Sequence, residues 1–217
     1  MLSRINQKRI YSKLNNIYKI HCPSENVYFY TNEIVKLINR FNKKNKKKKK
    51  YISEKTSMLI CYGDSIFSQN QKHSIKVFKN FFNKKLSKNF NTVHFLPFYP
   101  SSSDSGFAVK DHYKIDNKLG NWPDIKTFSK KNDVMADIVI THSSARGLWF
   151  KNFLKGKRPG KDYFLTVDSK FNTSKVVRPR DHKLLKKINI FGKTDYLWRT
   201  FSPDQLDLNF KNPAVLL

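Results

Sequence analysis

The chain has 217 residues, and its 43 Lys and Arg against 16 Asp and Glu give a formal charge of +27 at pH 7. The length fits one or two domains, and 39% hydrophobic residues, with 18 Phe among them, are enough to build a sizeable core. This composition excludes wholesale disorder. Apolar runs such as residues 134–140 are far shorter than the roughly 20 residues of a membrane span, so no membrane partner is expected.

The excess of cations first suggests a nucleic-acid partner, because Lys and Arg release counterions from phosphate. Here Lys is spread along the whole chain together with abundant Asn, Phe and Ile, as expected from the substitution bias of an AT-rich genome. Nucleic acid is therefore not the expected partner, although a basic RNA-associated protein stays open as an alternative. The acid-free N-terminus resembles a mitochondrial transit peptide, but the rest of the chain is equally basic. Cys22 and Cys61 are too few for a disulfide framework, which favours a reducing, cytoplasmic setting.

Two amphipathic helices are predicted first, over residues 3–18 and 33–41, from apolar side chains at i, i+3 and i+4 spacing. They are followed by NKKNKKKKK at residues 42–50, a low-complexity run whose like charges repel. We interpret this run as a linker, and a nuclear-import or nucleic-acid patch is the alternative.

The pattern then changes to short apolar runs at residues 58–61, 92–98 and 134–140, which predict three strands. Helical periodicity returns between them, near residues 75–82 and 122–130. This alternation is typical of βαβ units in a parallel sheet. From Ser143 to about Thr200 the chain is rich in Gly, Pro, Lys and aromatic residues, and we interpret it as an insertion.

Tests for common chemistry mostly fail: the six His residues show no HxH or HExxH spacing, so no metal site is expected. What remains is a pair of polar residues placed where strands of a barrel end. His142 follows the third predicted strand, and Asp111 lies in the loop after the second. Side chains at the carboxyl ends of parallel strands converge on one mouth, where an Asp and a His can hold sugar hydroxyl groups. A turn or capping role for Asp111 and a structural role for His142 are the alternatives.

Seven ordered blocks resemble the sucrose phosphorylase group of the α-amylase superfamily, in its glucosylglycerate phosphorylase-like branch. The blocks are YGDSI (62–66), HFLPFYPSSSDSGFAVKDHY (94–113), LGNWPDI (119–125), MADIVITH (135–142), WFKNFLKGKRPGKDYF (149–164), VVRPR (176–180) and FSPDQLDLNFKNP (201–213). The resemblance implies an α/β fold, the N-terminal part of a (β/α)₈ TIM barrel with about three strands and a small domain inserted after strand three. The expected segments are a helical preface with its linker (1–50), three β/α units (51–142), the inserted domain (143–200) and a truncated return to the barrel (201–217).

The resemblance also implies an activity, cleavage of sucrose or a related α-glucoside by inorganic phosphate to glucose 1-phosphate with retention. Asp111 and His142 are then expected to bind the hydroxyls of the glucosyl unit. Arg178 or Arg180 is expected to face phosphate or the acceptor, since a guanidinium donates two parallel hydrogen bonds, and surface charges on a basic loop are the alternative. Phosphate serves as co-substrate, and no cofactor is expected.

Two departures from the family pattern stand out. Thr141 replaces the Asn that usually precedes the His, which removes an amide. The nucleophilic Asp and the acid/base Glu of the family lie at the ends of strands four and five, and the sequence ends before either. We therefore expect no catalytic residue in this chain, no activity from the chain alone, and a downstream-encoded chain as a partner that supplies the remaining strands. A pseudoenzyme without function is the further alternative.

Overall fold

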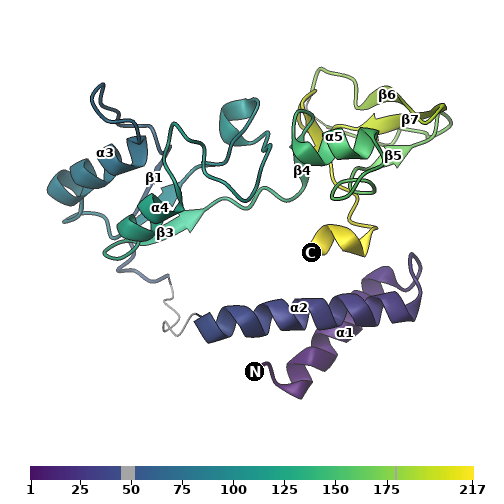
Figure 1. The fold of residues 1–217 in the computed structure, drawn as a ribbon, viewed down its shortest axis with the longest axis horizontal. Helices are drawn as coiled ribbons and strands as arrows, with labels where there is room; N and C mark the ends of the chain where they lie inside the picture. The colour runs from purple at the N-terminus through teal and green to yellow at the C-terminus, as the bar shows by residue number, and fades with distance from the viewer. Residues whose placement is uncertain (45–51, 179) are drawn as a thin grey trace. The chain divides into compact units, whose positions relative to one another are not determined.

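The computed structural model describes residues 1–44, 52–178 and 180–217. The chain divides into two compact units, one of Met1–Tyr51 with Asn209–Leu217 and one of Ile52–Leu208 (Figure 1). Most of the Lys-rich run interpreted as a linker, residues 45–50, lies outside the described residues.

The first unit is a pair of helices, α1 (Arg4–Tyr18) and α2 (Ser24–Lys44), joined by a short turn. The Ser3 hydroxyl caps α1 by accepting a hydrogen bond from the backbone N–H of Asn6 at 3.3 Å. Three buried side chains, Leu14 and Tyr18 from α1 and Val27 from α2, form the contact between the helices. Both helices were predicted, and α2 is longer than the predicted range 33–41 at both ends. A 3₁₀ turn, η3 (Pro213–Leu216), contacts α2 within this unit.

The second unit begins with a parallel sheet in the order β1 (Met58–Cys61), β2 (Thr92–Phe95) and β3 (Asp133–Ala136). The register aligns Leu59 with Val93 and Val93 with Val134. The prediction of three adjacent parallel strands is confirmed. The predicted third strand, 134–140, is too long, because pairing stops at Ala136. The next side chain, Asp137, forms an ion pair with His94 at 3.2 Å, and Ile138 is exposed.

Helices α3 (Ser74–Phe81) and α4 (Trp122–Phe128) both pack on one face of this sheet, and a π-helical turn, η1 (Phe82–Leu86), continues α3. The core between helices and sheet is aromatic. The rings of Phe78, Phe82, Phe95 and Phe128 lie with their centroids 5.3 to 5.9 Å apart. Edge-to-face contacts of this kind add to the free energy gained by burial. This face of the sheet is therefore well packed.

The remainder of the second unit is built from short antiparallel pairs. Strand β4 (His142–Ser144) pairs with β8 (Gln205–Asp207), and a second sheet has the order β5 (Thr166–Val167), β7 (Lys193–Trp198), β6 (Leu185–Ile190). Helix α5 (Leu148–Leu154) follows β4. The expectation that His142 directly follows the third strand is wrong: β3 ends at Ala136, and His142 begins a strand of its own.

The structure describes no helix with the length and apolar character needed to cross a membrane.

The second face of the parallel sheet carries a row of aligned side chains, Ile60, His94 and Met135. Ile60 is 60% exposed and Met135 is 45% exposed, and within the described chain β1 and β3 have no further strand partner. Exposed apolar side chains beside open strand edges favour association between chains.

We predict that replacing Ile60 and Met135 together by Lys reduces self-association of the purified chain, because it places charge on that face. Light scattering at matched protein concentration measures the change. The control replaces two apolar side chains outside the sheet that are even more exposed, Ile52 and Phe67, by Lys, and it should leave most of the scattering in place. Equal effects of the two pairs would mean that added charge, and not this face, controls association.

Candidate functional site

His142 lies at the start of β4 and is only 6% exposed. Its Nδ1 lies 3.0 Å from the hydroxyl of Thr141, and its Nε2 lies 3.1 Å from the carbonyl oxygen of Phe107 and 3.1 Å from the side-chain nitrogen of Gln205. Burial lowers the pKa of this His from its ordinary value, which keeps the ring neutral at neutral pH. A neutral ring uses Nε2 either to donate to the carbonyl or to accept from the amide, so the tautomer selects the partner.

Gln205 connects His142 to a carboxylate. Its side-chain nitrogen donates to Asp104 Oδ2 at 2.8 Å, and the residue is 1% exposed. One buried amide therefore holds together the loop after β2 and the first residue of β4. Neither Asp104 nor Gln205 is among the predicted site residues.

The loop that carries Asp104 is held in an unusual backbone conformation. Asp104 and Ser105 both have positive φ, at 57° and 48°, a region that non-Gly residues occupy rarely. Gly106 follows with φ of 100°, and a Cβ there would lie 2.6 Å from the carbonyl oxygen of Pro97. Strained backbone of this kind persists only where the surroundings hold it in place, and it is concentrated at functional sites.

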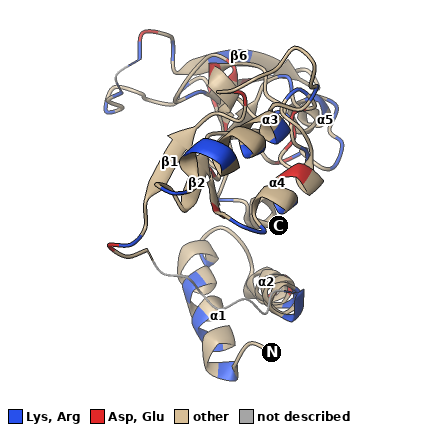
Figure 2. Cartoon of the chain, turned by 90° about the vertical axis from the view of Figure 1, so that its left-hand side faces the viewer, with Lys and Arg blue, Asp and Glu red and all other residues tan. Residues whose placement is uncertain are grey.

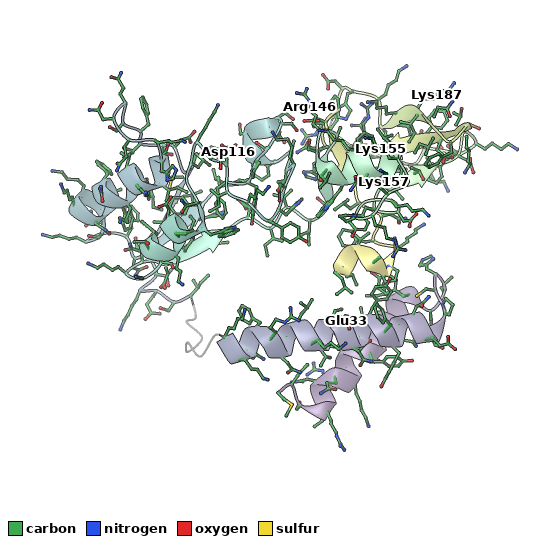
Figure 3. All side chains as sticks on the ribbon, in the orientation of Figure 1. Glu33, Asp116, Arg146, Lys155, Lys157 and Lys187 are labelled. Carbon is green, nitrogen blue, oxygen red and sulfur yellow. The ribbon has the colours of Figure 1, made fainter. Side chains whose placement is uncertain are left out.

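Asp204, the neighbour of Gln205, anchors the start of this loop. Its Oδ2 accepts hydrogen bonds from the hydroxyls of Ser102 and, at 2.8 Å, Ser103. On its other side, Oδ1 lies 3.9 Å from Nε of Arg146, which is labelled in Figure 3. The Ser102 hydroxyl also bonds the Ser144 hydroxyl, so the loop is tied to β4 as well as to β8.

Two further residues complete the surroundings of His142. The ring of Phe201 lies 4.9 Å from the imidazole, tilted by 48°. Asp207 is aligned with His142 in the β4–β8 ladder and accepts hydrogen bonds from the backbone N–H and the hydroxyl of Thr200, at 2.7 and 2.8 Å. Burial raises the pKa of Asp207 above its usual value, against the effect of these bonds. The cluster thus combines carboxylates, an amide, a neutral imidazole and an aromatic ring.

Asp111 takes part in a turn. Its Oδ1 accepts from the backbone N–H of Tyr113 at 2.9 Å, and its Oδ2 lies 3.4 Å from Nζ of Lys114. The next residue, His112, bonds the carbonyl oxygen of Val139 at 2.9 Å and stacks on Trp149. None of the described hydrogen bonds joins Asp111 to His142.

The two predicted arginines differ. Arg178 is half-buried and donates to the carbonyl oxygens of His182 and Thr200, so it is occupied within the inserted region. Arg180 is exposed. Among the described residues, no hydrogen bond or ion pair brings either guanidinium to His142 or Asp111.

A cavity of about 360 Å³ lies beside the strained loop, at the carboxyl ends of β1 and β2. It is lined by residues that follow these strands, and Asp116, labelled in Figure 3, adds a carboxylate. The lining includes Tyr62, Asp64, Tyr99, Ser105, Gly106, Asp116 and Lys118. In the described part of the chain, no group of three His, Cys, Asp or Glu side chains is placed to hold a metal ion.

The model of the "Alpha amylase, catalytic domain" family matches residues 84–216. The chain belongs to this family. It is 42% identical over 165 residues to the glucosylglycerate phosphorylase of Allomeiothermus silvanus, covering 76% of this chain and 30% of that protein. The glucosylglycerate phosphorylase of Escherichia coli K12 is 41% identical over 172 residues, covering 78% of this chain and 30% of the relative.

Among solved structures, the sucrose 6F-phosphate phosphorylase of Thermoanaerobacter thermosaccharolyticum superposes with a TM-score of 0.64 at 29% identity, covering 76% of this chain and 36% of that one. The resemblance to glucosylglycerate and sucrose phosphorylases is confirmed, and so is the fold class, the α/β barrel of the α-amylase family. The chain spans about a third of the length of the curated relatives that it matches.

The contribution of the Gln205 amide to stability can be measured by mutation. Gln205→Leu should lower the free energy of unfolding by about 1–3 kcal/mol, because it removes a hydrogen-bond partner from the buried ring of His142 and from the carboxylate of Asp104. Urea unfolding followed by Trp fluorescence measures the loss. The control Gln71→Leu changes an exposed Gln and should stay within about 0.5 kcal/mol. A loss no larger than that of the control would show that the amide does not hold the cluster.

Burial also gives the cluster a pH dependence. The pKa values of His112 and His142 lie below 6.5, mainly because both rings are buried, so the unfolded chain takes up protons that the folded chain resists. The free energy of unfolding should therefore fall as pH decreases from about 7 to about 5.5. The raised pKa of Asp207 has the opposite effect on the free energy of unfolding as the pH falls toward the acidic range in which carboxyl groups titrate. The comparison is therefore limited to about pH 5.5 to 7.

The double variant His112→Gln and His142→Gln should show a shallower decrease, whereas exposed His21→Gln should keep the parent slope. If the free energy of unfolding changed with pH in the same way in the parent chain, the double variant and the His21 variant, the explanation from buried imidazoles would be contradicted.

Proposed function

We propose that this chain forms the glucosyl-binding part of a retaining α-glucoside phosphorylase, which transfers a glucosyl unit from an α-glucoside to inorganic phosphate. The observation that carries the proposal is the cluster of buried His142, buried Gln205 and the exposed carboxylate of Asp104, in a chain of the α-amylase family. A carboxylate, an amide and a neutral imidazole supply the acceptors and donors that sugar hydroxyls need. Glucosylglycerate, sucrose and glucosylglycerol are the substrates suggested by the names of the relatives.

Within this proposal His142 and Asp104 contact the glucosyl hydroxyls, and Phe201 packs against the imidazole that binds them. Asp111 was expected in the same role, and its turn contacts leave that assignment a prediction. Arg180 is the better candidate for phosphate or the acceptor, because Arg178 already donates to two backbone carbonyls. Phosphate is the co-substrate, and the chemistry requires no organic cofactor or metal.

Retention requires two carboxyl groups about 5–5.5 Å apart, a nucleophile that forms a glucosyl-enzyme and an acid/base that serves both half-reactions. We assign both groups to the part of the barrel that follows the three strands of this chain, as the family resemblance implies. The remaining strands, whether they are encoded downstream or in the same frame, then form the catalytic partner. Free Cys22 and Cys61 suit a cytoplasmic location.

The test replaces the matching segment of E. coli glucosylglycerate phosphorylase by this chain. The chimera should release glucose 1-phosphate from glucosylglycerate only when phosphate is present, and the 217-residue chain alone should release none. His142→Ala and Asp104→Ala in the chimera should each lower kcat/KM about tenfold or more, because a hydrogen bond to a hydroxyl that strengthens in the transition state is lost.

Two matched carboxylate variants complete the design. Asp111→Ala distinguishes a turn role of Asp111 from a binding role. Only a binding role should lower kcat/KM as much as His142→Ala or Asp104→Ala does. Asp168→Ala removes a carboxylate from an exposed turn and should leave kcat/KM unchanged. A folded chimera without phosphate-dependent activity would overturn the proposal, and turnover by the isolated chain would overturn the assignment of the catalytic carboxyls.

A further inference from the structure

The excess of cations looks even along the sequence, but it is uneven between the two units. Among the described residues, the first unit carries ten Lys and Arg against two acidic residues, Glu25 and Glu33. The second unit carries 28 against 14. One of the two acids of the first unit, Glu33, is engaged by Lys36 at 2.6 Å. Relative to its acids, the first unit is the more basic part of the chain.

The cations of this unit are arranged on α1 so that they face solvent. Arg4, Lys8, Arg9 and Lys13 are all exposed. Figure 2 shows Lys and Arg recurring along α1. Helix α1 contains no acidic residue, and none of the described ion pairs joins these four side chains to a carboxylate. The buried side chains Leu14 and Tyr18 lie three and seven residues after Tyr11, on its side of α1, and Arg9 and Lys13 lie on the side away from them.

Aromatic rings border this basic face. Arg4, Lys8 and Tyr11 are spaced by four and three residues, which places them along one side of α1. Tyr11 contacts Tyr28 of α2, with ring centroids 6.3 Å apart in an edge-on arrangement. Tyr28 is 62% exposed, so its ring remains accessible from solvent beside the two cations.

We propose that this N-terminal basic surface, formed by Arg4, Lys8, Arg9, Lys13, Tyr11 and Tyr28, binds single-stranded nucleic acid. Cations that lack a carboxylate partner release counterions from phosphates, and exposed aromatic rings offer a platform on which unstacked bases stack. A lipid surface fits less well. A helix that lies in a membrane interface inserts a continuous apolar side, whereas the exposed apolar side chains of α1, Ile5 and Ile17, lie about 120° apart around the helix.

The test measures binding of the full chain to a fluorescein-labelled 20-nucleotide oligo(U) by fluorescence anisotropy, over a series of KCl concentrations. Changing Arg4, Lys8, Arg9 and Lys13 together to Gln should reduce the slope of log K against log salt by up to about 3, because each phosphate contact in a single strand contributes about 0.7. The matched control changes four exposed lysines of the second unit, Lys84, Lys85, Lys88 and Lys130, to Gln, with the same loss of charge. This control should leave the slope near that of the parent.

A second pair of variants tests base stacking. Tyr28→Ala should weaken binding roughly fivefold or more with little change in the salt slope. Its matched control is Phe29→Ala, a neighbouring ring that is 55% exposed but turned about 100° around the helix, and it should have little effect. Far-UV circular dichroism confirms that each variant keeps its helices.

Three results would overturn the proposal. Equal losses from the two sets of four substitutions would mean that only overall charge matters. Equal effects of Tyr28→Ala and Phe29→Ala would remove the stacking platform. Binding to vesicles of phosphatidylcholine and phosphatidylglycerol that is tighter than binding to oligo(U), and that depends on the same four cations, would assign the surface to membranes.

Discussion

The buried side chain of Gln205 is the contact on which the candidate site depends, because it is shared by two segments that the chain brings together from far apart. Its amide reaches Asp104 in the loop after β2 and His142 at the start of β4, while its own backbone lies in β8. The β4–β8 ladder fixes the position of the amide, and the amide in turn fixes the loop. An amide suits this place, because it can donate to a carboxylate and to a neutral imidazole without introducing a charge.

The cluster is locally acidic in a chain of strongly positive charge. Asp104, Asp204 and Asp207 all lie around His142 or its loop, and two of them are satisfied by hydroxyls and backbone N–H groups. Such a site suits neutral hydroxyl groups, which hydrogen-bond to carboxylates at little electrostatic cost. It does not suit phosphate, which the same carboxylates repel. Under the proposed function an anion would therefore approach from a different side, and this repulsion is the physical reason for proposing a guanidinium of the inserted region as the phosphate-binding group.

The parts that the sequence predicts well are those set by local pattern. The apolar runs at 58–61 and 92–98 predict β1 and β2 because they alternate with segments whose apolar residues have helical spacing. Apolar residues of the same runs form the face of the sheet that packs against the helices. The predicted end of the third strand is wrong because the ladder stops at Ala136, just before Asp137, which contacts His94 of the neighbouring strand. A contact between two strands cannot be predicted from the apolar residues of one segment. His142 is predicted as a site residue from its place after an apolar segment, and that role stays a prediction. Asp104, which belongs to the proposed site, is not predicted from the sequence because its signals are a positive φ and a contact with Gln205, 101 residues later, and neither can be derived from spacing.

The organisation of the cluster is compatible with the proposal that one part of a barrel carries a glucosyl-binding site. The loop that carries Asp104 and Ser105 is held by Asp204 and by Ser144, and His142 Nε2 is held by Gln205 or by the carbonyl of Phe107, depending on the tautomer. All of these groups belong to the compact unit Ile52–Leu208, so each contact closes within that unit. The parallel sheet contributes by positioning the loop, and its helix-covered face gives it a packed core. The proposed sugar-binding groups thus need no contact with the two carboxyl groups that the proposal assigns elsewhere, because the loop after β2 and the β4–β8 ladder form one network of their own.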